Sequence, residues 1–406
     1  MDQIKSWPLL ADIQAAQKRL NGIVLQTPMI FSPVFSHESG CEVFLKPENL
    51  QITGSFKIRG AYNKIAQLTD REKERGLITA SAGNHAQGVA YSSQLTGMPA
   101  VIVMPTVTPL IKIEATKQYG AQVVLSGLNY DEAYDEAMRL QKKNDYVFIH
   151  PFNDIDIMAG QGTIGLEILA EHPDVDCILV PVGGGGLIGG IASAVKAMNP
   201  NIAVIGIEPT GAASMTRSRE AGVPIRLDKV DTIADGVAVK RPGNLTFDAS
   251  LHFVDDMINV TDQELTEAFL LLLERHKLIS EASGLLSVAA AKHWKKKGQK
   301  VVAVISGGNI DVMSIASMIQ SGLVERGRIF CFSVELPDVP GELLKVCQVL
   351  AAENANIVQV VHDQFKASDS LKKVNLEAIV ETFGHQHCIE IIAAMERAGY
   401  QVKRVY

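Results

Sequence analysis

The chain has 406 residues, of which 47% are hydrophobic and 20% are charged. This composition excludes a disordered or fibrous protein, and the length allows a large core and more than one domain. Lys and Arg number 38 against 45 Asp and Glu, for a net charge of -7, so we expect no nucleic-acid partner. The cysteines are scattered without a C-x-x-C pair, which argues against a disulfide scaffold or a zinc site and favours a reducing cytoplasm; they are Cys41, Cys177, Cys331, Cys347 and Cys388.

The first twenty residues predict an amphipathic helix rather than a signal peptide. Leu10, Ile13, Ala16 and Leu20 recur at helical spacing, and no uninterrupted apolar segment precedes them. The uncharged stretch 177–195 contains a proline and six glycines, which make a poor membrane-spanning helix. We therefore expect neither export nor a membrane partner.

Short apolar runs alternate with longer amphipathic stretches over most of the chain. This alternation predicts βαβ units and a largely parallel sheet, so the fold class of the main part is α/β. Glycine-containing loops at 81–88, 183–186 and 306–309 each follow an apolar run, and ligands bind at the carboxyl ends of strands in such sheets. The predicted strands are 123–126, 146–150, 177–182, 203–209 and 300–305, and the clearest helices are 131–144 and 261–277.

The pattern changes near residue 325. The polar segment 321–328 is followed by about 75 residues whose apolar pattern gives the order β-α-β-β-α-β. This is the ferredoxin-like α+β order, in which two helices cover one face of an antiparallel sheet. We place the domains at 1–325 and 326–406.

Four segments could carry chemistry, and each has an ordinary structural alternative. Lys57, within TGSFKIRGA, could form a Schiff base if desolvated or could be a surface lysine. SAGNHAQG, 81–88, could present backbone N–H groups and Asn84 to an anion, or could be a plain helix start in which His85 is a buried structural residue. Ser306, in SGGN, could point at a ligand or cap a helix.

The glycine run 183–186 fits two kinds of site. Gly184, Gly186 and Gly189 match G-x-G-x-x-G, and Glu208 ends the next apolar run, as in a dinucleotide-binding fingerprint. Four consecutive glycines also suit a nest of N–H groups around one phosphate. A purely structural tight turn is the third alternative, and the run alone does not decide between the two kinds of site.

Seven motifs in one order resemble the threonine and serine dehydratases of the tryptophan-synthase-β-like (fold type II) pyridoxal-phosphate enzymes. They are TGSFKIRGA, SAGNHAQG, HPFND with AGQGT, GGGGL, ADGVAVKRPG, EASG and SGGN. The tail resembles an ACT domain, and the chain is identified as a member of the threonine dehydratases (threonine ammonia-lyases) with one ACT domain. The resemblance implies a two-lobed catalytic region, with a large lobe of about 1–50 and 150–325 and a small lobe of about 51–149 that closes over the substrate.

The resemblance also implies roles for individual residues. Lys57 would hold pyridoxal 5'-phosphate and act as the catalytic base on the substrate α-carbon. The cofactor would further be bound by Asn84 at its 3-hydroxyl and by Ser306 at its pyridine nitrogen. The loop Ser81, Ala82, Gly83, Asn84 and His85 would bind the substrate carboxylate, and Gly183, Gly184, Gly185, Gly186 and Leu187 would bind the cofactor phosphate.

The implied reaction converts L-threonine, and also L-serine, to a 2-oxo acid and ammonia. L-serine dehydration as the main activity, an NAD-dependent dehydrogenase and a non-catalytic amino-acid sensor are the alternatives, and intact Lys57 argues against the sensor. Related racemases carry a second serine where this chain has Ala82, so we expect poor racemisation. They also carry an acidic metal ligand where this chain has Ser214, and we leave open whether a metal binds at Glu208 and the Ala212 carbonyl. The ACT domain would bind an amino-acid or other small effector near Asp338 and Gly341, serve isoleucine biosynthesis or catabolism, and pair in a homodimer or homotetramer.

Overall fold

The computed structural model describes residues 7–294, 296–363 and 373–406, which form two compact units, Met1–Asp311 and Val312–Tyr406. The division lies fourteen residues before the boundary that the sequence suggests at 325. Helix α14 (Val312–Glu325) accounts for the difference, because it belongs to the second unit. None of the described helices is both long and apolar enough to cross a membrane.

The first unit is built on a six-stranded sheet with the order β1-β2-β10-β7-β8-β9. All neighbouring strands are parallel except the short β1, which pairs antiparallel with β2. Parallel strands need crossover connections, and the alternation in the sequence supplies these as helices. The strands are β1 (Ile30–Phe31), β2 (Glu42–Pro47), β7 (Cys177–Pro181), β8 (Ala203–Pro209), β9 (Asp256–Val260) and β10 (Lys300–Ile305).

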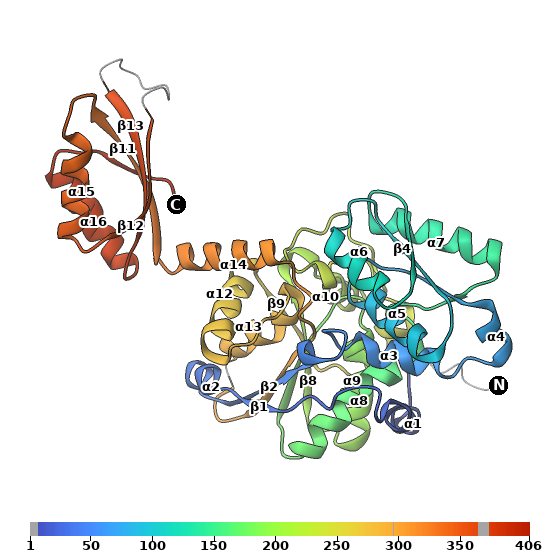
Figure 1. Ribbon diagram of the computed structural model, residues 1–406. Helices are drawn as coiled ribbons and strands as arrows, with labels where there is room; N and C mark the ends of the chain where they lie inside the picture. The colour runs from blue at the N-terminus through green and yellow to red at the C-terminus, as the bar shows by residue number, and fades with distance from the viewer. Residues whose placement is uncertain (1–6, 295, 364–372) are drawn as a thin grey trace. The chain divides into compact units, whose positions relative to one another are not determined.

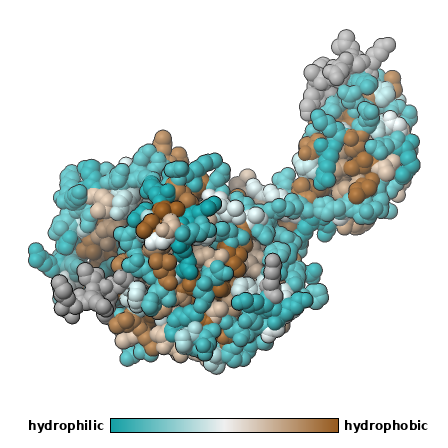
Figure 2. All heavy atoms as spheres, turned by 180° about the vertical axis from the view of Figure 1, so that it is seen from behind, coloured by the Kyte–Doolittle hydropathy of each residue, from teal (hydrophilic) through white to brown (hydrophobic). Residues whose placement is uncertain are grey.

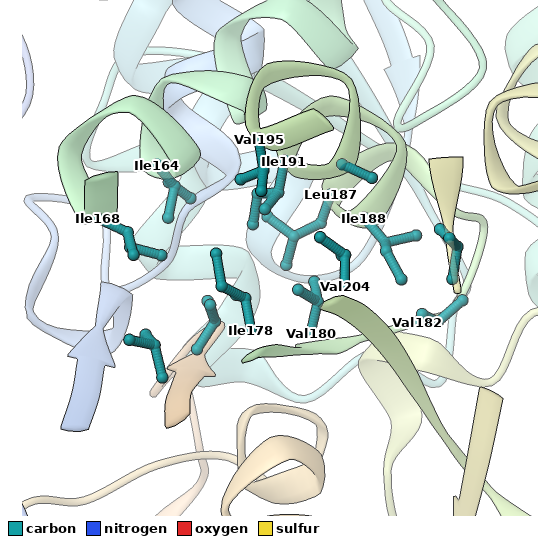
Figure 3. Close-up of a cluster of buried hydrophobic side chains, with 14 of the residues drawn as sticks. Ile164, Ile168, Ile178, Val180, Val182, Leu187, Ile188, Ile191, Val195 and Val204 are labelled. Carbon is teal, nitrogen blue, oxygen red and sulfur yellow. The ribbon is translucent and has the colours of Figure 1, made fainter. Parts of the chain in front are cut away.

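Branched aliphatic side chains form the main core between this sheet and two helices. Figure 3 shows side chains of α8 (Ile155–Glu171) and α9 (Gly186–Met198) facing those of β7 and β8. Helix α13 (Leu286–Lys292) contacts β7, β8 and β10. The predicted N-terminal helix is confirmed as α1 (Leu10–Leu20), and its Ile13, Ala16 and Leu20 are buried.

A second, four-stranded parallel sheet has the order β5-β4-β3-β6 and lies within residues 77–148 (Figure 1). Its strands are β3 (Leu77–Ala80), β4 (Ala100–Met104), β5 (Gln122–Leu125) and β6 (Val147–Phe148). The remaining helices of the first unit are α2 (Pro33–Ser39), α3 (Lys57–Ile65), α4 (Asp70–Arg75), α5 (Asn84–Thr96), α6 (Leu110–Lys117), α7 (Tyr130–Asn144), α10 (Ser214–Ala221), α11 (Asn244–Phe253) and α12 (Asp262–Leu271).

The second unit has the ferredoxin-like order that the sequence predicts. After α14 it runs β11 (Ile329–Pro337), α15 (Glu342–Ala352), β12 (Asn356–Asp363), β13 (Lys373–Glu381), α16 (His385–Arg397) and β14 (Val402–Arg404). The antiparallel sheet has the order β12-β13-β11-β14 and shares a core with both helices. Figure 2 shows hydrophobic residues gathered on the visible face of this unit.

Candidate active site

The glycine run 183–186 lies between β7 and α9. Gly185 has φ +91°, a conformation that favours glycine. A Cβ on Gly184 would lie 2.3 Å from the Phe152 ring, and one on Gly183 would lie 2.8 Å from the Val237 Cα. Glycine is therefore required here by close packing, and larger residues would displace the loop.

A carbonyl group of this glycine run is hydrogen-bonded by a neighbouring side chain. Thr246 Oγ1 donates to the Gly184 carbonyl at 2.6 Å and to the Gly243 carbonyl at 3.1 Å. Within the described part of the chain, no acceptor pairs with the backbone N–H groups of Gly183, Gly184 or Gly185. The loop thus offers N–H groups at the start of α9, where the helix dipole favours an anion.

Lys57 is the first residue of α3 and is half-buried. Its Nζ donates to the Pro151 carbonyl at 2.8 Å and lies 5.3 Å from the centre of the Phe56 ring. Loss of hydration lowers the pKa of Lys57 to about 8, and the negative charge of Glu281 opposes this shift. A larger fraction of this amine is neutral near pH 7 than for an ordinary lysine, which suits a nucleophile or a base.

The segment before Lys57 is joined to the loop after β10. Ser55 forms an isolated bridge with Gly307, and Phe56 N–H donates to the Ser306 carbonyl at 3.1 Å. The buried Ser55 Oγ and Thr53 Oγ1 have no partner within the described residues. Since buried hydroxyls are normally paired, they mark a place where a ligand could supply the missing bonds.

Ser306 itself is buried at the end of β10. Its Oγ makes one long contact, 3.5 Å to the Ser283 carbonyl. The joined loops therefore bring the Ser306 hydroxyl to the same end of the structure as Lys57, as the resemblance implies.

Asn84 is the first residue of α5, and its side chain is bonded on both sides. Its Nδ2 donates to Glu281 Oε1 at 2.5 Å, and its Oδ1 accepts from Asn309 Nδ2 at 2.7 Å. Burial raises the pKa of Glu281 to about 7, while the bond from Asn84 opposes that shift. Glu281 is thus a proton-carrying group next to Asn84 that titrates near neutral pH.

The remainder of the predicted substrate loop divides into two parts. Ser81, Ala82 and Gly83 are half-buried, and the Ser81 Oγ accepts from Gly83 N–H at 3.3 Å. His85 is buried with its Nε2 3.0 Å from the Ile149 carbonyl. Burial and nearby Lys57 lower the pKa of His85 to about 3, so its ring is neutral and serves to join α5 to the end of β6.

The segment 150–153 connects Lys57 to the glycine run. His150 Nδ1 accepts from Phe152 and Asn153 N–H at 3.2 and 2.9 Å, which fixes the turn. Pro151 then accepts from Lys57, and Phe152 packs on Gly184. The motifs HPFND and EASG contribute to the resemblance, but the sequence alone assigned no role to Phe152 or Glu281; Thr246 carried no recognisable signal.

Glu208 is fully buried near the end of β8, and its carboxylate faces the start of α10. It accepts from Met215 and Thr216 N–H at 2.8 Å each, while burial raises its pKa to about 7. The nearby Ser214 Oγ is buried without a partner among the described residues. No group of three or more His, Cys, Asp or Glu side chains in the described part of the chain is arranged to hold a metal.

The predicted effector residues line a pocket of about 280 Å³ in the second unit. Asp338 and Gly341 lie in the loop between β11 and α15, and Gly341 has φ +96°. His362 of β12 also lines the pocket. The pocket offers polar and charged groups to a small ligand.

Comparisons with known proteins agree with this geometry. The chain is 47% identical over 397 residues to a Thermotoga maritima protein named L-threonine ammonia-lyase, covering 98% of this chain and 99% of that one. It is 44% identical to a Geobacter sulfurreducens protein of the same name, covering 96% and 98%.

Solved structures give the same result. Processed threonine deaminase isoform 2 from Solanum lycopersicum is 40% identical with a TM-score of 0.74, covering 77% of this chain and 92% of that one. Maize serine racemase is 36% identical with a TM-score of 0.74, covering 79% and 99%. A family model described as pyridoxal-phosphate-dependent enzyme matches residues 20–307. The chain therefore belongs to the pyridoxal-phosphate-dependent enzyme family.

Proposed function

We propose that this chain is a threonine ammonia-lyase, which converts L-threonine to 2-oxobutanoate and ammonia and also accepts L-serine. The observation that carries this proposal is the desolvated amine of Lys57, joined through Pro151 and Phe152 to the glycine run. The names of the relatives identical at 44% and 47% over nearly the whole chain support threonine as the substrate. One methyl group separates threonine from serine, and a pocket discriminates such a difference by only about 1–3 kcal/mol, so L-serine as the main substrate is the alternative.

The residues present fit pyridoxal 5'-phosphate. The unpaired N–H groups of Gly183, Gly184 and Gly185, with Gly186 and Leu187 at the start of α9, would hold its phosphate. Lys57 would bind its aldehyde carbon, Asn84 its 3-hydroxyl and Ser306 its pyridine nitrogen. Membership of the family supports this phosphate nest over the dinucleotide fingerprint.

Bound pyridoxal phosphate supplies a sink for the electron pair left when a bond at the substrate α-carbon breaks. Lys57 Nζ, with its lowered pKa, takes the α-proton. The loop from Ser81 to His85, which leads into α5, holds the substrate carboxylate on backbone N–H groups. A serine hydroxyl is far too weak an acid to keep a pyridine nitrogen protonated, so Ser306 favours prompt loss of the β-hydroxyl over transamination.

Replacement of the lysine tests the proposal. K57A is expected to lose turnover of L-threonine and the covalent visible-absorbing link to pyridoxal phosphate, whereas K117A, which removes an exposed lysine of α6, keeps both. The assay is the absorbance spectrum before and after L-threonine, with 2-oxo acid measured in the same cuvette. Turnover by K57A at the rate of K117A would refute the role of Lys57.

We further propose that the second unit is a regulatory ACT domain in a homodimer or homotetramer. The pocket beside Asp338 and Gly341 would take an amino-acid or other small effector, and exposed apolar side chains such as Phe383 and Ile389 would be covered by pairing. D338N is expected to weaken the response of the full chain to isoleucine without changing uninhibited turnover. Five unpaired cysteines support a place in the cytoplasm.

A further inference from the structure

A cluster of four buried charges lies behind the first turn of α3. Arg59, Lys46, Glu48 and Glu167 are each at most 7% exposed. Arg59 Nε and Nη2 donate to the two oxygens of Glu48 at 2.7 and 2.8 Å, and Nη1 and Nη2 donate to the two oxygens of Glu167 at 2.5 and 3.0 Å. Lys46 Nζ completes the set at 2.7 Å from Glu167 Oε2. Two positive and two negative groups are thus matched, and each makes an ion pair.

The cluster ties α3 to distant parts of the first unit. Lys46 is the penultimate residue of β2, Glu48 lies in the 3-10 turn Glu48–Leu50, and Glu167 lies in α8. Burial alone would raise the pKa of Glu48, but Arg59 and Lys46 hold it below its usual value. The planar guanidinium binds both carboxylates in a two-pronged manner, which fixes direction as well as distance.

Arg59 and Lys57 occupy opposite sides of the same helical turn. Successive residues of an α-helix are rotated by about 100°, so positions two apart differ by about 200°. Arg59 therefore fixes the first turn of α3 from the side opposite to the one on which Lys57 lies. The backbone is equally confined, because a Cβ on Gly160 of α8 would lie 2.5 Å from the Arg59 carbonyl and 2.6 Å from the Gly60 Cα.

Helix α8 also packs on the helix that begins at the glycine run. A Cβ on Gly190 of α9 would lie 2.1 Å from the Met158 carbonyl of α8, and one on Gly162 would lie 2.7 Å from the Gly190 carbonyl. The contacts α3 to α8 and α8 to α9 thus set the position of Lys57 relative to the glycine run.

We propose that Arg59 is a positioning residue, which holds the Lys57 amine in register with the glycine run through Glu48 and Glu167. A buried ion cluster is weak evidence for stability, since apolar residues of similar volume often serve as well. The fixed geometry of the cluster, on the same helical turn as a reactive amine, instead suits accurate placement of that amine. A misplacement of about 1 Å costs on the order of a hundredfold in rate. This inference rests on the proposed role of Lys57.

The test compares R59K with K196M. R59K keeps a buried positive charge but cannot bind two carboxylates in two-pronged fashion. K196M removes the ion pair with Asp255 at the far end of α9, away from Lys57. For each variant kcat and KM for L-threonine, the urea midpoint, and the pH midpoint of pyridoxal-phosphate capture by the cofactor-free protein are measured.

R59K is expected to lower kcat at least tenfold with KM changed less than twofold, and to move the capture midpoint up toward that of an ordinary lysine. K196M is expected to lower the urea midpoint but leave kcat and the capture midpoint unchanged. If R59K does not fold, E48Q, which keeps the shape of the side chain, is expected to give the same changes at three- to tenfold in kcat.

Loss of urea stability in R59K or E48Q with kcat and capture as in K196M would overturn the proposal and leave a purely structural cluster. This failure is distinct from failure of the proposed function. In the latter case K57A itself would retain the covalent link, and wild-type capture would not depend on Lys57.

Discussion

Asn84 Nδ2 donates to Glu281 Oε1 at 2.5 Å, and this bond joins the start of a helix that packs on the four-stranded sheet to a loop beside the six-stranded sheet. A Cβ on Gly307 would lie 2.6 Å from the same Glu281 oxygen, so the loop after β10 closes tightly around the pair. The predicted partner of the cofactor 3-hydroxyl is thus itself oriented by an acid that titrates near neutral pH. Proton occupancy of Glu281 consequently affects both stability and the neighbouring amine.

Replacing Glu281 by Gln should flatten the pH dependence of stability. The folded-state pKa of about 7 exceeds the ordinary glutamate value of 4.5, so the folded chain binds more protons between these values and wild-type stability falls as pH rises through that window. The unfolding free energy of E281Q minus that of wild type should increase by about 3 kcal/mol from pH 4.5 to 8 and then stay constant. Urea unfolding of the cofactor-free proteins at several pH values measures the difference.

An exposed glutamate provides the matched control for this experiment. E38Q on α2 removes a charge from a solvent-exposed position, and its difference from wild type should not vary by more than a few tenths of a kcal/mol over the same pH range. Parallel curves for E281Q and wild type would mean that Glu281 is ionised normally in the folded chain.

The Lys57 amine should capture pyridoxal phosphate with a pH midpoint near 8. Only the neutral amine attacks a carbonyl, and loss of hydration lowers the pKa of Lys57 to about 8 from 10.5. The observed rate should therefore rise about tenfold per pH unit below the midpoint and level off above it. Stopped-flow absorbance of cofactor-free protein follows the reaction, and E281Q should move the midpoint down because Glu281 no longer stabilises the ammonium.

A capture rate that keeps rising past pH 10 would contradict this assignment, since it would match a fully hydrated lysine. K57A separates the two possibilities. Its remaining reaction reports the surface lysines, and subtracting it from the wild-type signal isolates Lys57.

Local sequence patterns were sufficient to predict the architecture, because the spacing of apolar residues, the glycine loops and the order of the elements can all be read from residues close together in the chain. They correctly predicted the α/β core, the N-terminal helix and the ferredoxin-like order of the second unit. They did not predict the contact between Asn84 and Glu281, whose positions are 197 residues apart. Such a pair has no periodic signal, and only the packing of the start of α5 against the loop before the 3-10 turn Ala282–Leu285 brings it together.

Contacts between residues far apart in the chain also explain two other features that the sequence did not predict. Thr246 supports the glycine run from 62 residues away, and a single threonine before an apolar stretch is unremarkable in sequence. The polar segment 321–328 suggested a boundary near 325, but α14 extends into it as far as Glu325 and is assigned by its contacts to the second unit.

Thr246→Val should weaken cofactor retention by about tenfold. Its hydroxyl donates to the Gly184 and Gly243 carbonyls, and a neutral hydrogen bond contributes about 1 kcal/mol with an added cost when a buried acceptor is left unpaired. Without it the glycine carbonyls can turn inward and take their N–H groups out of register. Equilibrium titration of cofactor-free protein with pyridoxal phosphate measures the change.

Thr266→Val is the control for this substitution. Thr266 Oγ1 donates to the Asp262 carbonyl within α12 at 3.0 Å, so its loss removes the same group from a half-buried helix elsewhere. Equal cofactor affinities for the two variants would show that Thr246 has no particular role in shaping the glycine run.

Ser306→Asp should change how the reaction partitions rather than how substrate binds. Ser306 is buried at the end of β10, where its Oγ lies 3.5 Å from the Ser283 carbonyl. A carboxylate placed there would keep a pyridine nitrogen protonated, which strengthens electron withdrawal and favours transamination over loss of the β-hydroxyl. The expected result is at least a tenfold rise in pyridoxamine phosphate formed per 2-oxobutanoate, measured by chromatography after exposure to L-threonine. Ser306→Ala removes the hydroxyl without adding charge and should leave that ratio low; an S306D ratio equal to that of S306A would show that this side chain does not set the protonation of the ring.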